Sequence, residues 1–140
     1  MTDLSTTTSR MIAAPAQKVF EAWLNADTLT KFMLPRADMP EPACTTDPIE
    51  GGRFDILMMV GENEIPHAGT YKEISRYSRL VFTWESPFSV DDSTVTVDFD
   101  EVEGGTNVTL THVKFPSEES RDNHNQGWSH ILKMLDEFAA

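Results

Sequence analysis

The feature that most constrains this chain is a series of alternating strands followed at once by a long amphipathic segment. Between Gly51 and Phe115, apolar and polar residues alternate in short runs separated by turn residues, a pattern typical of antiparallel strands. From Ser117 onward, apolar residues recur at helical spacing instead. A long amphipathic helix must bury its apolar stripe, and the inner face of the sheet is the available surface. The sequence therefore predicts an α+β fold.

The alternation assigns a large apolar set to the inner face of this sheet. Its members are Phe54, Ile56, Met58, Phe82, Trp84, Val95, Val97, Phe99, Val108 and Leu110. The predicted helix adds a stripe formed by Trp128, Ile131, Leu132, Leu135 and Phe138. We expect most of these side chains to fill the core. A single helix across a strongly curved sheet can nevertheless leave a cavity, and such sites are mostly apolar with a few polar groups.

The N-terminal third of the chain predicts shorter elements. Thr6–Ile12 is β-branched and polar, which favours an edge strand. Pro15 suits the start of one helix, and Asp27 is the predicted N-cap of a second. Four prolines fall within Met33–Pro48 and exclude a continuous helix. We expect a loop there, with a short edge strand at Cys44–Thr46.

Length, charge and cysteine content limit the possible functions. A chain of 140 residues predicts a single domain over residues 1–140. Eleven basic and 23 acidic residues give a net charge of −12, which disfavours binding to nucleic acid or to anionic membranes. The polar first residues and the lack of a long apolar run predict a cytoplasmic location. A single cysteine, Cys44, argues against a disulfide or a multi-cysteine metal site. We expect no metal and no cofactor.

Acidic residues gather on the predicted sheet. Seven of them lie between Leu80 and Val113, where the sequence has no lysine or arginine. One interpretation is a solvated face that maintains solubility. The alternative is a docking surface for a basic protein partner. The sequence leaves open whether the protein is a monomer or a homodimer.

A set of short motifs, in this order, resembles a known family. The motifs are Ala14-Pro15 with Val19-Phe20 and Trp23, Gly51-Gly52-Arg53-Phe54, Gly69-Thr70-Tyr71-Lys72-Glu73-Ile74, Arg79-Leu80-Val81 with Thr83-Trp84, Gly105-Thr106 with Leu110-Thr111-His112, and Gly127-Trp128 ahead of Leu132 and Leu135. They resemble the START-like (SRPBCC) superfamily and, within it, the family of homologues of the activator of heat-shock-protein ATPase. The resemblance implies a helix-grip fold, a curved antiparallel β-sheet wrapped around a long C-terminal α-helix, with two short helices after the first strand.

The resemblance also implies a cavity between sheet and helix that holds a small hydrophobic molecule of lipid, polyketide or aromatic type. We expect residues from the inner sheet face and from all three helices to line it. The predicted ligand-binding residues are Phe20, Trp23, Phe32, Phe54, Met58, His67, Tyr71, Phe82, Trp84, Val97, Leu110, His112, Trp128, Ile131 and Leu135.

His112 is the candidate residue for chemistry within this set. It is in phase with Val108 and Leu110, so its ring should point inward. A buried imidazole needs a hydrogen-bond partner, which allows either a structural histidine or a group that orients a ligand or acts as a general base. The leading hypothesis is a non-catalytic carrier or sensor, with no catalytic residue assigned. The alternatives are an enzyme of cyclase or hydrolase type using His112, with Tyr71 as a second acid–base group, and a chaperone- or partner-binding module.

Overall fold

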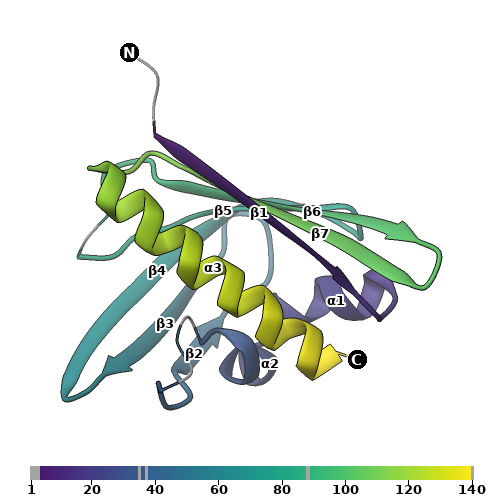
Figure 1. Ribbon diagram of the computed structural model, residues 1–140, viewed down its shortest axis with the longest axis horizontal. Coiled ribbons are helices and arrows are strands. Elements are labelled where there is room, and N and C mark those ends of the chain that lie inside the picture. The colour runs from purple at the N-terminus through teal and green to yellow at the C-terminus, as the bar shows by residue number, and fades with distance from the viewer. Residues whose placement is uncertain (1–3, 35, 37, 88, 140) are drawn as a thin grey trace.

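The computed structural model describes residues 4–34, 36, 38–87 and 89–139 and contains one curved antiparallel sheet and three helices (Figure 1). The strand order is β1-β7-β6-β5-β4-β3-β2. The strands are β1 (Ser5–Ile12), β2 (Ala43–Thr46), β3 (Arg53–Val60), β4 (Asn63–Ser75), β5 (Arg79–Thr83), β6 (Thr94–Val102) and β7 (Gly105–Val113), and the helices are α1 (Ala16–Ala22), α2 (Ala26–Phe32) and α3 (Glu118–Ala139). This is the helix-grip fold that the sequence predicted.

Alternation along the strands sets which side chains face the helices. In β7 every second residue from Thr106 to His112 is buried, and the intervening residues are partly exposed. The register between β6 and β7 pairs buried residues across the strands, with Val97 opposite Leu110 and Val95 opposite His112. Buried pairs of this kind stabilise one sheet face. The predicted inner face is therefore confirmed.

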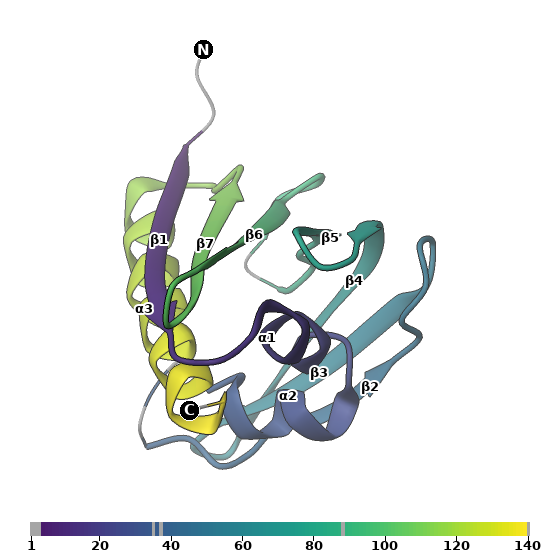
Figure 2. The same cartoon turned by 90° about the vertical axis from the view of Figure 1, so that its right-hand side faces the viewer.

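Both edges of the sheet also follow the prediction. β1 forms one edge and pairs only with β7, while the short β2 forms the other edge and pairs only with β3. In Figure 2 the strands follow an arc from β1 to β2, and α1 lies on the concave side of that arc. The sheet thus encloses the space in which a binding site is expected.

Local signals fix the starts of the helices, and one of them corrects the sequence analysis. Asn25, not Asp27, is the N-cap of α2, since its Oδ1 accepts hydrogen bonds from the backbone N–H groups of Asp27 and Thr28. Asn and Asp both serve as N-caps, and the residue two positions earlier already meets the need. Ser117 caps the start of α3, because its Oγ accepts a hydrogen bond from the Ser120 N–H.

Strand β4 bends where it crosses the sheet. A register shift between Tyr71 and Glu73 interrupts its pairing with β5. A side chain at Gly69 would overlap both the Thr83 carbonyl oxygen and the Phe54 ring, so only glycine allows this close approach. Bulges increase local bending and twist, and the β3–β4 hairpin extends beyond this point (Figure 1).

The apolar stripe of helix α3 is buried as predicted except at Phe138, in its last turn. Trp128, Ile131, Leu132 and Leu135 are buried as predicted, but Phe138 is 37% exposed. Phe138 instead lines an outer groove beside α1 and α2. The helical spacing alone could not show this, because the apolar stripe drifts around a straight helix and in the last turn Ala139, not Phe138, is the buried residue.

Candidate ligand-binding site

A recess of about 160 Å³ lies between the β3–β4 hairpin, β5 and the N-terminal half of α3. Its lining residues are Met58, His67, Trp84, Asn123, His124, Gly127, Trp128 and Ile131. Four of these, Met58, Trp84, Trp128 and Ile131, are large apolar side chains with 4% exposure or less. The recess thus has an apolar floor beneath a few polar groups.

The residues that α3 contributes to the recess lie on one face of the helix because of their spacing in the sequence. Positions 123, 124, 127 and 131 are three or four residues apart and share one helix face. Gly127 has no side chain, so the helix leaves open the space that any other residue at this position would occupy. A glycine in a helix interior is unfavourable by about 1 kcal/mol relative to alanine. At this position the glycine lines the recess, where a larger side chain would take up space.

The aromatic wall of the recess is continuous with the core. The Trp84 and Trp128 rings meet edge to face with centroids 4.9 Å apart. The His67 ring lies 5.0 Å from the Trp84 ring. Such contacts between rings favour fixed orientations, so these side chains form a shaped surface.

His67, on the polar rim of the recess, is held neutral by its surroundings. Burial, with a smaller effect from the nearby His124, lowers the pKa of His67 to about 4. His67 Nδ1 lies 3.1 Å from the Ile65 carbonyl oxygen, which can only accept, so Nδ1 carries the proton. By the same argument His124 Nδ1 donates to the Ser120 carbonyl oxygen at 2.7 Å. At neutral pH the recess therefore presents an uncharged His67 to a ligand.

His112 lies behind the recess and has both ring nitrogens engaged. Trp128 Nε1 donates to His112 Nδ1 at 3.0 Å, which makes Nδ1 the acceptor and places the ring proton on Nε2. That Nε2–H lies 2.6 Å from Ser93 Oγ, which accepts it. Burial, followed by the charge effect of His124, lowers the pKa of His112 to about 3. The ring is fully buried and points inward, and neither nitrogen is free to bind a ligand or take up a proton.

A second cavity, of about 10 Å³, lies deeper in the core. Its walls are Trp23, Leu29, Met33, Phe54, Ile56, Tyr71, Phe82 and Trp84. All eight residues are 3% exposed or less. Trp84 lines both spaces, so its indole separates the recess from this inner cavity.

The fifteen predicted ligand-binding residues divide into three groups. Met58, His67, Trp84, Trp128 and Ile131 line the recess. Trp23, Phe54, Tyr71 and Phe82 line the inner cavity with Trp84. The others line neither space and are buried in the core: Phe20, Phe32, Val97, Leu110, His112 and Leu135.

Three recess residues were not among the predicted set: Asn123, His124 and Gly127. The signal was present in their spacing, because Asn123 lies four residues before Gly127, His124 four before Trp128 and Gly127 four before Ile131, on one helix face. They were missed because two of them are polar and Gly127 has no side chain, so none belongs to the apolar pattern that identified the other lining residues.

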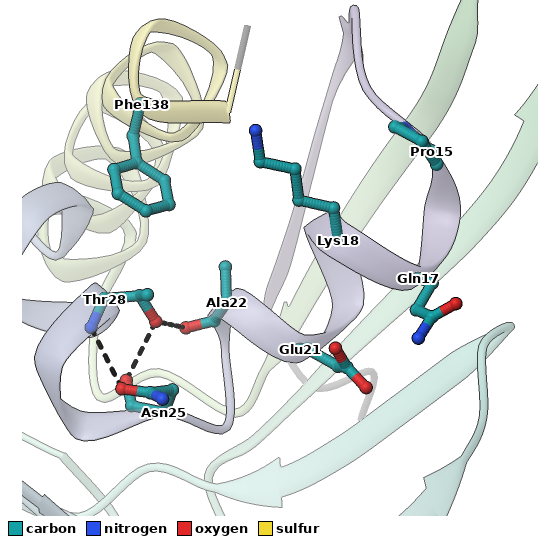
Figure 3. A pocket seen from close by; sticks show the side chains of 8 residues that line it. All are labelled: Pro15, Gln17, Lys18, Glu21, Ala22, Asn25, Thr28 and Phe138. Atoms are coloured by element: carbon teal, nitrogen blue, oxygen red, sulfur yellow. Dashed lines mark hydrogen bonds between the residues drawn. The ribbon is translucent and has the colours of Figure 1, made fainter.

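A larger concavity of about 430 Å³ lies outside the sheet–helix interior, between α1, α2 and the end of α3 (Figure 3). Its walls include the exposed side chains of Gln17, Lys18 and Glu21. Lys18 Nζ donates to the Ala139 carbonyl oxygen at 2.9 Å, and Thr28 Oγ1 bonds within the same groove to the Ala22 carbonyl oxygen. The walls of the groove are largely exposed and several of its polar atoms are already paired, so we assign the candidate site to the recess.

Other site types find less support. Among the described residues, no three His, Cys, Asp or Glu side chains are placed to share a metal ion. Burial raises the pKa of the Cys44 thiol to about 11, which leaves little thiolate at neutral pH. No helix in the described ranges has the length and apolar character needed to cross a bilayer.

The acidic surface is partly neutralised by basic residues from outside the 80–113 segment. Arg53 pairs with Glu85 at 3.0 Å, and Arg79 pairs with Asp98 at 2.7 Å. Glu101 accepts the Ala16 N–H at the start of α1. Several acidic side chains thus have roles within the fold itself.

The fold and the recess together define a START-like protein of the helix-grip class. The chain belongs to the family described as "Activator of Hsp90 ATPase homolog 1-like protein", whose model matches residues 13–140. This confirms the resemblance drawn from the motifs. A search of curated proteins found no significant match.

Solved structures show the same fold. Protein CV1439 from Chromobacterium violaceum superposes with a TM-score of 0.84 at 20% identity, covering 96% of each chain. The AHSA1-like protein from Aeromonas hydrophila gives 0.83 at 23% identity, covering 96% of this chain and 91% of its own. CalU16 from Micromonospora echinospora gives 0.74 at 23% identity, covering 99% and 77%. At these identities the likeness establishes the architecture and nothing about ligands.

Proposed function

We propose that this protein is a non-catalytic carrier or sensor that binds a small apolar molecule in the recess between the sheet and α3. The observation that carries the proposal is the recess itself, with its aromatic and methionine floor and an uncharged His67 on its rim. Its volume of about 160 Å³ is close to that of an engineered cavity, about 150 Å³, that binds benzene. The size therefore favours a ligand with one aromatic ring over a long lipid or a multi-ring polyketide.

Acid–base catalysis has weaker support from the geometry. Both nitrogens of His112 are hydrogen-bonded in the core, and burial, with a smaller effect from Asp47, raises the pKa of the Tyr71 phenol. A general base needs a free lone pair within reach of substrate. We therefore prefer binding without turnover.

Docking of a basic partner through the acidic sheet also has weaker support, because ion pairs with Arg53 and Arg79 already engage Glu85 and Asp98. The acidic face is better explained by solubility.

A titration with toluene tests the proposal directly. We expect saturable binding that changes the fluorescence of the two tryptophans in the recess, Trp84 and Trp128. The variant Gly127→Leu should abolish it, since the new side chain fills the recess, whereas Gln126→Leu adds the same side chain at an exposed position of the same helix and should leave binding intact. Equal binding by both variants, or no saturable binding by the wild-type protein, would contradict the proposal.

A further inference from the structure

Two buried indole groups in this protein lack hydrogen-bond partners. Trp23 Nε1 and Trp84 Nε1 are the buried side-chain nitrogen or oxygen atoms for which the described residues offer no partner. Their side chains are 2% and 3% exposed. Leaving such a donor unpaired costs about 1–3 kcal/mol, and buried tryptophans usually find an acceptor. Trp128 does so in this same core by donating to His112.

Both unpaired donors belong to residues that line the inner cavity. The rest of its wall is hydrocarbon or aromatic apart from the Tyr71 hydroxyl and the Met33 sulfur, and includes Leu29, Ile56 and Phe82. Two buried donors on the wall of one such space call for an acceptor.

The chemistry of the wall selects the kind of acceptor. A volume of about 10 Å³ is close to the minimum for one water molecule. A water molecule would bring two O–H donors of its own, and for these the wall offers only the Tyr71 hydroxyl and the weakly accepting Met33 sulfur. A carbonyl or ether oxygen accepts two hydrogen bonds and donates none. The site therefore suits an acceptor atom without hydrogens.

We propose that the inner cavity is the acceptor end of the ligand site, and that the ligand is an apolar ring carrying a carbonyl or ether oxygen. This inference rests on the proposed function. The ring occupies the recess beside Trp128, and the oxygen accepts hydrogen bonds from Trp23 Nε1 and Trp84 Nε1. The Trp84 indole forms a wall of both spaces, so this binding mode requires that side chain to turn and connect them.

The test compares two probes of nearly equal shape. Acetophenone carries a ketone oxygen where α-methylstyrene carries a methylene group. We expect acetophenone to bind about tenfold more tightly by isothermal titration, which is the effect of one net hydrogen bond of about 1.4 kcal/mol. Equal affinities would overturn the inference and leave the proposed function standing. Failure of both probes to bind would overturn both.

Indole proton resonances supply a second measurement that does not depend on affinity. In ¹⁵N-labelled protein, acetophenone should move the Trp23 and Trp84 Nε1–H signals downfield, while α-methylstyrene should not. The Trp128 signal is the internal control, because its N–H is already bonded to His112. An unchanged pair of signals under saturating ketone would overturn the inference.

A shape-preserving substitution tests each donor separately. Replacing Trp23 by benzothienylalanine, which has sulfur in place of N–H, keeps the ring volume and avoids the cavity that Trp23→Phe would create. The preference for ketone should fall several-fold. An unchanged preference in both the Trp23 and Trp84 replacements would contradict the assignment.

Discussion

The two ends of the sheet–helix interior contain similar apolar side chains, but one end is packed solid and the other borders the recess. Near the C-terminal end of α3, Phe20, Phe99 and Leu135 are buried and line neither the recess nor the inner cavity. Near its N-terminal half, Trp84 and Trp128 are equally buried but border an open recess. In Figure 1, α1 and α2 lie near the C-terminal end of α3, and the β3–β4 hairpin extends on the other side. The two short helices thus close one end of the interior, which we call the filled end, and the opposite end, which we call the open end, borders the recess.

Truncation at the filled end should have the largest effect on stability. Phe20 is fully buried and packs edge to face against Phe99 at 5.0 Å. Phe20→Ala should lower the free energy of unfolding by about 3–5 kcal/mol, measured by urea denaturation at pH 7. Toluene affinity of the folded fraction should be unchanged. A loss below 1 kcal/mol would show that this end is not tightly packed.

At the open end, the hydrogen bond behind the recess should have the next largest effect. Trp128→Phe keeps an aromatic ring but leaves His112 Nδ1 without its donor. We expect a loss of about 1–3 kcal/mol in unfolding free energy, since an acceptor is left buried and unpaired.

A double-mutant cycle with His112→Leu isolates that bond. The two substitutions together should destabilise the protein less than the sum of the single effects, because residues in one hydrogen-bond network are coupled. Strict additivity would mean that the Trp128–His112 bond contributes nothing to stability.

The filled end was largely predictable from the sequence, and the open end only in part. Strand alternation placed Val97 and Leu110 in the core correctly, because a period of two leaves no choice of face once one side is apolar. The same rule predicted that His112 points inward. It could not show that Trp128 and Ser93 would engage both ring nitrogens, since those partners lie on α3 and before β6, and their approach depends on tertiary packing.

The boundary between filled core and cavity was not readable from the sequence. Phe20 and Phe54 look alike as buried aromatic residues, yet only Phe54 lines a cavity. What separates them is where α1 and α2 close over the sheet, and helix placement is set by packing rather than by local propensity. Asn123 and His124 were overlooked for a related reason. A polar residue on a helix lines a site only if the fold places other lining residues next to it, and this depends on tertiary packing.

The pH dependence of stability should distinguish the two ends further, because His67 lies at the open end. Its folded-state pKa of about 4 is below the ordinary value of 6.5. The unfolded chain therefore binds more protons between these pH values, and the stabilisation present above pH 6.5 is lost as the pH falls toward 4. Between pH 7 and pH 5, the unfolding free energy of the wild-type protein should fall by about 1–2 kcal/mol more than that of His67→Gln.

Urea denaturation of both proteins at the two pH values measures this difference. Parallel losses in the two proteins would show that His67 is as well hydrated in the folded state as in the unfolded chain. His112 is present in both proteins, so its own contribution cancels in the comparison.

The smallest expected effect is at Gly127, a glycine in the helix interior at the open end. Gly127→Ala should raise the unfolding free energy by about 0.5–1 kcal/mol, since alanine is the better helix former, and should weaken toluene binding because its methyl group enters the recess. Gln126→Ala, at an exposed neighbouring position, should change both quantities little. The opposite signs of the two effects at position 127 are the informative result, because a residue that served only the helix would gain stability without any change in affinity.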